Sequence, residues 1–118
     1  MIEINRIYDE PNKKDGFRIL MDRLWPRGLT KDRAKVDLWM KEIAPSNELR
    51  KWFGHDLEKW PEFKRRYFAE LGDKRELVDQ IRDGSKKGKV VLLYGAKEKR
   101  FNNGVALKEY IETKKSRA

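Results

Sequence analysis

The chain has 118 residues, of which 42% are charged and 38% hydrophobic, and its formal net charge is +9. It contains no Cys and a single His, His55, which excludes disulfides, a Cys nucleophile and a multi-His metal site. No signal peptide and no apolar segment of about 20 residues is present. We therefore predict one small cytoplasmic domain over residues 1–118, without a membrane segment. The abundance of Lys, Arg and Glu also fits a heat-adapted source.

Strand patterns dominate the first third of the chain. Residues 2–8 alternate between apolar and polar and predict a strand with one buried face. After a polar turn, the apolar run at 17–22 predicts a second, central strand. Thr30 is placed to cap a short helical turn, and residues 36–43 are ambiguous but fit a third strand.

Helical patterns follow. Ser46 is predicted to cap a helix that stops at Gly54. Apolar residues at helical spacing predict a second helix over 60–72, with Pro61 in its first turn, and a third helix that ends at Gly84.

A buried strand and a last helix complete the chain. Residues 89–94 read as a fully buried strand, and either Asn102 or Asn103 is placed to cap the final helix. Strands interleaved with helices predict an α/β fold: a single small domain with a mostly parallel sheet of about four strands flanked by helices.

Polar side chains cluster where the predicted strands end. In open parallel α/β sheets, ligands bind beyond the C-terminal ends of the strands, and arginine forks and helix-start amides suit an anion. The predicted ligand-binding residues are Arg23, Trp25, Arg27, Ser46, Tyr94, Lys97, Asn102 and Asn103. The candidate catalytic residues are Asp22, Glu42 and His55, the first two as a base or a metal ligand.

Each of these residues also has a structural interpretation. Asp22 and Arg23 can lock the turn by pairing with neighbours, and Trp25 can pack in the core. His55 can cap a helix end, and the two asparagines can serve only as helix caps. The functional and structural interpretations therefore both stay open at this point.

Basic clusters form a second signal. The residues that could track a nucleic-acid backbone are Lys64, Arg65, Lys86, Lys87, Lys89, Lys99 and Arg100. No helix-turn-helix, RNP or zinc-finger pattern accompanies them. Dinucleotide-binding, Walker, serine-hydrolase and zincin motifs are absent as well, and we predict neither a cofactor nor a dedicated metal site.

Three segments resemble the YeaO-like branch of domain-of-unknown-function family 488. They are DGFRILMDRLWPRG (15–28), DLWMKEIAPSNELRKWFGHD (37–56) and VVLLYGAKEKRFNNGVALKEY (90–110). The resemblance implies a small single-domain α/β protein of bacteria or archaea, with no established biochemical activity.

Several residues carry the resemblance. The matching motif positions are Asp15, Gly16, Arg18, Asp22, Arg23, Trp25, Pro26, Arg27, Gly28, Glu42, Pro45, Ser46, Leu49, Arg50, Phe53, His55, Leu93, Tyr94, Lys97 and Asn102. Larger members of this family have a Cys-rich strand end and a Cys-His-Arg run before the last helix. This chain has Tyr94 and residues 101–103 (FNN) there, so a mechanism that uses a thiol or a second imidazole in that loop is disfavoured.

Three hypotheses follow from the sequence. The first is a site for a phosphate-bearing or other anionic ligand, such as a nucleotide, at the strand ends, with or without catalysis. The second is a non-enzymatic nucleic-acid-binding protein that uses the basic clusters. The third is a structural or partner-binding module.

Overall fold

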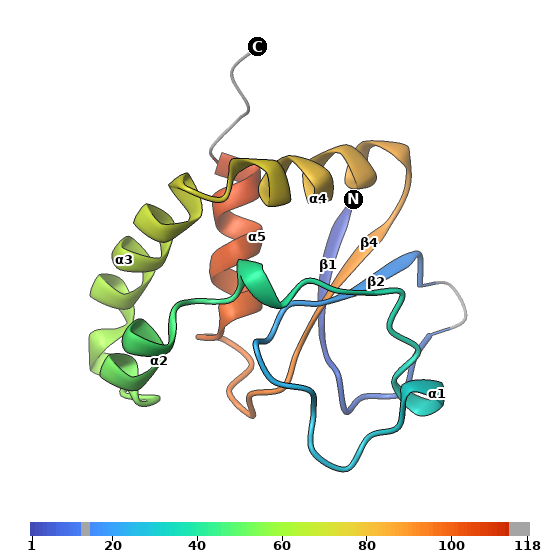
Figure 1. Ribbon diagram of the computed structural model, residues 1–118, viewed down its shortest axis with the longest axis horizontal. Coiled ribbons are helices and arrows are strands. Elements are labelled where there is room, and N and C mark those ends of the chain that lie inside the picture. Colours follow the sequence, from blue (N-terminus) through green and yellow to red (C-terminus); the bar gives the residue numbers. More distant parts are fainter. Residues whose placement is uncertain (13–14, 114–118) are drawn as a thin grey trace.

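The strand order decides which chain segments meet at each edge of the sheet. A computed structural model describes residues 1–12 and 15–113, and four strands within them form one sheet in the order β1-β4-β2-β3 (Figure 1). The strands are β1 (Ile2–Arg6), β2 (Phe17–Leu20), β3 (Leu38–Trp39) and β4 (Val90–Tyr94). All three pairings are parallel, which confirms the predicted sheet and places the C-terminal ends of the strands at one edge.

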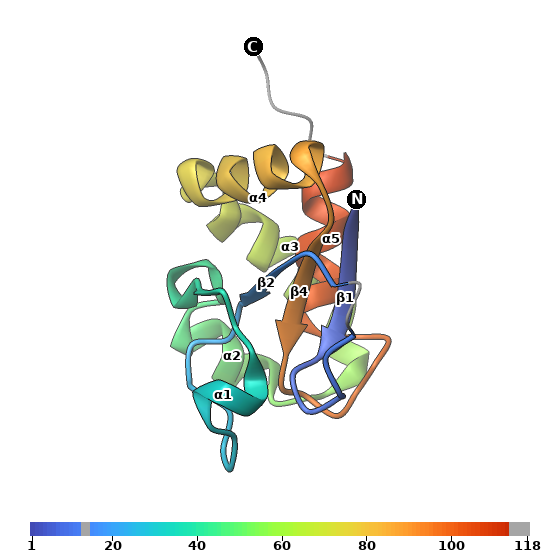
Figure 2. The ribbon, with the colours of Figure 1, turned by 90° about the vertical axis from the view of Figure 1, so that its right-hand side faces the viewer.

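The helices surround this sheet unequally. They are α1 (Lys31–Ala34), α2 (Asn47–Phe53), α3 (Trp60–Gly72), α4 (Arg75–Lys87) and α5 (Asn103–Thr113), with short 3-10 turns at Lys41–Ile43 and Leu57–Lys59. Figures 1 and 2 show α3, α4 and α5 grouped together, with α1 well apart from them.

β4 is buried along its whole length because both faces of the sheet are covered. Val90 and Leu92 belong to a large apolar cluster with residues of α2 to α5. Val91 and Leu93 belong to a smaller cluster that includes Ala34 of α1. Since successive side chains of a strand point to opposite faces, this alternation defines two core layers.

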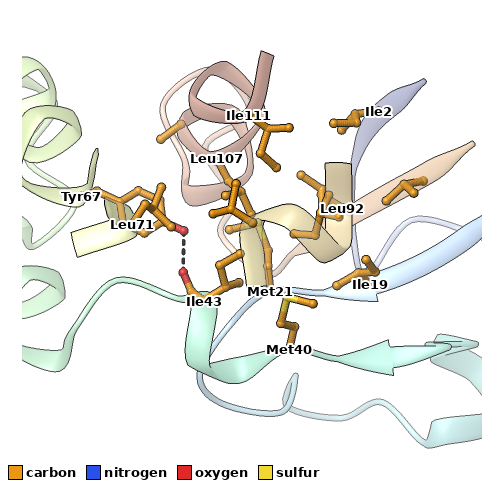
Figure 3. Close-up of a cluster of buried hydrophobic side chains, with 14 of the residues drawn as sticks. Ile2, Ile19, Met21, Met40, Ile43, Tyr67, Leu71, Leu92, Leu107 and Ile111 are labelled. Carbon is orange, nitrogen blue, oxygen red and sulfur yellow. Dashed lines mark hydrogen bonds between the residues drawn. The ribbon is translucent and has the colours of Figure 1, made fainter. Parts of the chain in front are cut away.

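The large cluster joins the sheet to the helices around one buried hydroxyl. Tyr67 of α3 has no exposed surface, and its hydroxyl donates a hydrogen bond of 2.8 Å to the backbone oxygen of Ile43 (Figure 3). Leu71, Leu92 and Leu107 pack in the same cluster. This hydrogen bond satisfies a polar group that would otherwise be costly to bury, and it ties the 3-10 turn after β3 to α3.

The predicted helix ends are mostly confirmed. The side chain of Thr30 accepts a hydrogen bond from the backbone N–H of Arg33, and α2 is capped by Ser46 and ends at Gly54 in a left-handed conformation. Of the two asparagines, Asn102 is the residue that caps α5. These signals are local, and they specify local structure reliably.

Several element boundaries differ from the predictions. β1 stops at Arg6, where the backbone turns and Asp9 N–H donates to the Arg6 oxygen at 3.1 Å. β2 ends at Leu20 and not at residue 22, and the backbone bends at residues 23–24. The ambiguous segment 36–43 contains only the two-residue strand β3 and then a 3-10 turn.

The third helix also runs further than predicted. α4 continues past Gly84 to Lys87. A Cβ atom at Gly84 would lie 3.4 Å from a methyl group of Val90. This is an ordinary van der Waals distance, and the glycine lies inside the helix and does not end it.

Candidate functional site

A cavity of about 540 Å³ lies beyond the C-terminal ends of β2 and β4. Four parts of the chain line it: the turn after β2, the segment from the end of β3 through α2 to residue 55, α3, and the segment from the end of β4 to the start of α5. Six of the predicted site residues meet there, namely Asp22, Arg23, His55, Tyr94, Asn102 and Asn103. Parallel pairing of β2 with β4 brings the first and last of these segments together.

Asp22 is held firmly at the base of the turn after β2. Its Oδ2 atom accepts a hydrogen bond of 2.7 Å from the Gly95 N–H, and its backbone oxygen accepts one of 2.7 Å from the Trp39 indole. Burial raises the pKa of Asp22, while the Gly95 hydrogen bond and the positive charge of Arg50 act in the opposite direction. Among the described residues that line the cavity, Asp22 is the one with an acidic side chain.

Arg23 is only weakly engaged by the rest of the protein. Its Nη2 lies 3.4 Å from the Ala44 oxygen and 3.5 Å from the Pro45 oxygen, near the limit for a hydrogen bond. The Ala44 oxygen has a shorter partner, Lys74 Nζ, at 2.9 Å. The buried Nε of Arg23 has no hydrogen-bond partner in the described part of the chain. The guanidinium therefore retains donors that an anion could use.

The last turn of α2 contributes two further cations. Arg50 and Lys51 both line the cavity and are exposed, and Arg50 Nη2 donates to Asn47 Oδ1 at 3.2 Å. Cations are favourable in the last turn of a helix because they interact with the helix dipole. Here they also face the same cavity as Arg23.

A tight turn after α2 places His55 at the edge of the cavity. Gly54 and His55 both have positive φ, at 53° and 59°. A positive φ is uncommon for a residue other than glycine. The imidazole lies 6.3 Å from the Phe53 ring, centre to centre, and is exposed.

Asn102 lines the cavity but serves the fold. It is 3% exposed, its Oδ1 accepts from the Val105 N–H at 3.0 Å, and its Nδ2 donates to the Glu98 oxygen at 2.9 Å. Its structural interpretation as a helix cap is therefore what the geometry shows. Asn103 is the first residue of α5 and is partly exposed at the cavity.

Tyr94 ends the central strand at the same edge. It is nearly buried, and burial raises the pKa of its hydroxyl. Its side chain also contacts the start of α5 closely: a Cβ atom added at Gly104 would lie 3.3 Å from Tyr94 Cδ1. Tyr94 thus forms part of the wall that separates the cavity from the core.

Trp25 and Arg27 lie outside the cavity lining. The Trp25 indole donates to the Leu29 oxygen at 2.7 Å. Its ring packs edge-to-face against Trp39, with 5.5 Å between the ring centres. It packs against the smaller core cluster, so its structural interpretation fits the geometry. The Arg27 side chain is exposed, and the Tyr8 hydroxyl donates to the Arg27 backbone oxygen at 3.0 Å.

Ser46, Glu42 and Lys97 also lie outside this lining. Ser46 Oγ accepts from the Leu49 N–H at 3.1 Å and donates to Glu70 Oε2 at 2.6 Å, so it caps α2 and ties it to α3. Glu42 and Lys97 are exposed. The predicted rim is therefore only partly assembled.

Part of the predicted nucleic-acid set is already paired. Arg65 and Arg66 both bond to Glu62, at 2.6 and 2.8 Å, and these bonds lower the pKa of Glu62 to about 2. Lys64 pairs with Glu109 at 3.1 Å, and Lys89 pairs with Glu3 at 3.0 Å. Lys64, Arg65 and Lys89 each therefore lie beside a carboxylate that balances much of their charge.

The remaining basic residues lie at opposite ends of β4. Lys86 and Lys87 are exposed at the end of α4, before the strand begins, whereas Lys99 and Arg100 follow its C-terminal end. Five strand residues span about 17 Å. Arg100 also stacks over Phe101, with its guanidinium carbon 5.4 Å from the ring centre.

Sequence reasoning missed several cavity residues. Arg50 and Lys51 contribute charge, and Leu24, Phe63 and Phe101 contribute apolar surface. Two adjacent cations before a helix-ending glycine do indicate an exposed helix end. No local signal, however, indicates that this helix end returns to the strand edge.

Residues 1–12 and 15–113 contain neither a cluster of metal-ligating side chains nor a helix that could span a membrane. No three His, Cys, Asp or Glu side chains gather there into a group that could hold a metal ion. None of the helices in these ranges combines the length and the apolar character needed to cross a bilayer.

Fold and cavity together define a small α/β domain with a cation-lined pocket at the strand ends of a parallel sheet. A family model described as the inactive DUF488-N3 subclade matches residues 1–118, and the chain belongs to this family. It is 39% identical over 112 residues to the uncharacterized protein YeaO of Escherichia coli K12, covering 95% of this chain and 97% of that protein.

Proteins from mycobacteria match a shorter part of the chain. The uncharacterized protein Rv3073c of Mycobacterium tuberculosis H37Rv is 42% identical over 78 residues, 66% of each chain. The uncharacterized protein Mb3100c of Mycobacterium bovis matches to the same extent. No solved structure matches this chain. The family assignment confirms the resemblance inferred from the three sequence segments.

Proposed function

We propose that the protein binds a small phosphate-bearing ligand in the cavity and acts as a binding protein without catalysis. One observation carries the proposal: Arg23, Arg50 and Lys51, from two separate parts of the chain, line the same cavity at the strand ends. Guanidinium and ammonium groups bind phosphate through charge-assisted hydrogen bonds.

Two further features support an anion at this place. The cavity includes Asn103, the first residue of α5, and the start of a helix favours negative charge. The buried Nε of Arg23 lacks a partner among the described residues, and an unpaired buried donor is costly. A phosphate oxygen would satisfy it.

The residues of the cavity favour binding over turnover. The chain has no Cys, its one imidazole is exposed, and Asp22 already accepts the Gly95 hydrogen bond. The description of the matching family as an inactive subclade points the same way.

Calorimetric titration with ribose 5-phosphate tests this proposal. Arg23→Ala and Arg50→Ala should each weaken binding about tenfold, because a hydrogen bond to a charged group contributes about 1.5 kcal/mol or more. Arg27→Ala is the matched control: it removes the same charge from the same turn, outside the cavity lining, and should change affinity less than about twofold.

Two results would contradict the proposal. One is the absence of binding by wild type at millimolar ribose 5-phosphate. The other is equal affinity of wild type, Arg23→Ala and Arg50→Ala. Thermal unfolding of each variant, measured in parallel, verifies that it is folded during the titration.

A further inference from the structure

Part of the cavity lining is apolar, in contrast to the cations described above. Leu24, Phe53, Phe63 and Phe101 all line it, and they come from the turn after β2, from α2, from α3 and from the segment before α5. Leu24 is 65% exposed, so its side chain is accessible to a ligand in the cavity. A bare phosphate ion would not use this wall.

The accessible aromatic ring is Phe101. It is partly exposed, whereas Phe53 and Phe63 are 7% and 1% exposed. Its ring packs against Trp60, with 5.4 Å between ring centres, which limits its motion. Arg100, an exposed side chain, also lies over this ring with its guanidinium carbon 5.4 Å from the ring centre, so a flat ligand group that stacks on Phe101 would compete with Arg100 for the ring.

The charges in the cavity match one phosphate monoester. Arg23, Arg50 and Lys51 carry three positive charges and Asp22 carries one negative charge, which leaves a balance of about two positive charges. A phosphate monoester carries about −1.5 to −2 charges at pH 7. The volume of about 540 Å³ also falls within the range of small-molecule sites.

Asp22 calls for a hydrogen-bond donor on the same ligand. Its carboxylate lines a cavity that otherwise favours anions, and within residues 1–12 and 15–113 only its Oδ2 atom accepts a hydrogen bond, from the Gly95 N–H. The other oxygen can accept from a hydroxyl or amino group. A ligand that carries only a phosphate would instead be repelled by it.

The geometry points to a nucleoside monophosphate as the ligand. Its phosphate would bind to the cations, its base would stack on Phe101 beside Leu24, and a hydroxyl or amino group would donate to Asp22. This inference rests on the function proposed above and deepens it. It assigns a binding role to the apolar residues and to the Asp22 carboxylate, neither of which is needed to bind phosphate alone.

Competitive titration of the full chain with AMP and ribose 5-phosphate tests the inference. AMP should bind at least about tenfold more tightly, because stacking of a base on an aromatic ring contributes that much. Phe101→Ala should remove this advantage, so that AMP and ribose 5-phosphate bind the variant with affinities within about twofold of each other. Phe17→Ala is the matched control, since Phe17 is an exposed phenylalanine at the start of β2, the opposite end of the strand.

The outcomes separate the two proposals. If ribose 5-phosphate binds as tightly as AMP, UMP, CMP and GMP, the nucleoside inference is wrong and phosphate binding stands. If none of these compounds binds, both proposals fail. The comparison of AMP with ribose 5-phosphate uses wild type alone, so it decides the matter even if Phe101→Ala does not fold.

Discussion

The Asp22 carboxylate accepts a hydrogen bond of 2.7 Å from the backbone N–H of Gly95, a residue 73 positions later in the chain. This bond joins the turn after β2 to the segment after β4. These two segments follow the central strands and line two sides of the cavity. A Cβ atom at Gly95 would lie 3.1 Å from the same carboxylate oxygen, so the two backbones approach closely. This contact therefore holds the acid against the segment after β4.

The stability of the protein should depend on pH through Asp22. Burial raises the pKa of this carboxyl above its ordinary value of 3.8, so the folded state binds its proton more tightly than the unfolded state does. The free energy of unfolding should therefore fall as pH rises from that value to the raised pKa of the folded state. Asp22→Asn should remove this decrease, since the Asn oxygen can still accept from Gly95.

Urea denaturation at a series of pH values measures this effect. Taking the difference between wild type and Asp22→Asn isolates the one group, because all other carboxyls are common to both. Asp83→Asn, a change at an exposed aspartate of α4, serves as the control. A difference between wild type and Asp22→Asn that stays constant with pH would refute the assignment.

The same substitution should change the affinity for two ligands by different amounts. Without the carboxylate, the cavity repels anions less, and inorganic phosphate should bind about two- to fivefold more tightly. A nucleoside monophosphate should gain less, or bind more weakly, because it loses its acceptor. Calorimetric titration of both ligands against both proteins decides this, and equal gains would argue against a donor at Asp22.

Gly16 is required by a close approach of backbone to backbone. A Cβ atom there would lie 2.0 Å from the Lys89 oxygen, which accepts the Phe17 N–H at 2.9 Å. Gly16→Ala should therefore lower the free energy of unfolding by about 2–4 kcal/mol. Gly72→Ala is the matched control: nothing lies within 4 Å of its Cβ position at the end of α3, and it should be neutral or stabilising. Equal effects would contradict the argument.

Ser46 should matter for stability and not for the ligand. It caps α2 and its hydroxyl donates to Glu70 at 2.6 Å, so Ser46→Ala should cost about 1–2 kcal/mol in unfolding free energy. Thr30→Ala, which removes the cap of the four-residue helix α1, should cost less. The affinity of Ser46→Ala for ribose 5-phosphate should stay within about twofold of wild type. A loss of affinity without a loss of stability would restore Ser46 to the binding site.

Local signals predicted local structure well. The helix caps Ser46 and Asn102 and the buried run that becomes β4 act over a few residues, so a short window contains the physical cause. The strand-end position of Asp22 and Arg23 was also predictable, because it follows from one apolar run and the rule for parallel sheets. Errors arose where a local signal was ambiguous, as at Gly84, where the helix continues through the glycine to Lys87.

Composition and local patterns were enough to predict the absence of thiol chemistry, the parallel α/β class and six of the residues that line the cavity. The folded chain was needed to show that the end of α2 returns to the strand edge, which adds Arg50 and Lys51, and that Trp25 packs against the core. It also decided that Arg65 and Arg66 share Glu62. The reason is that composition and periodicity act along the chain, whereas a cavity forms from segments that only strand order and core packing bring together.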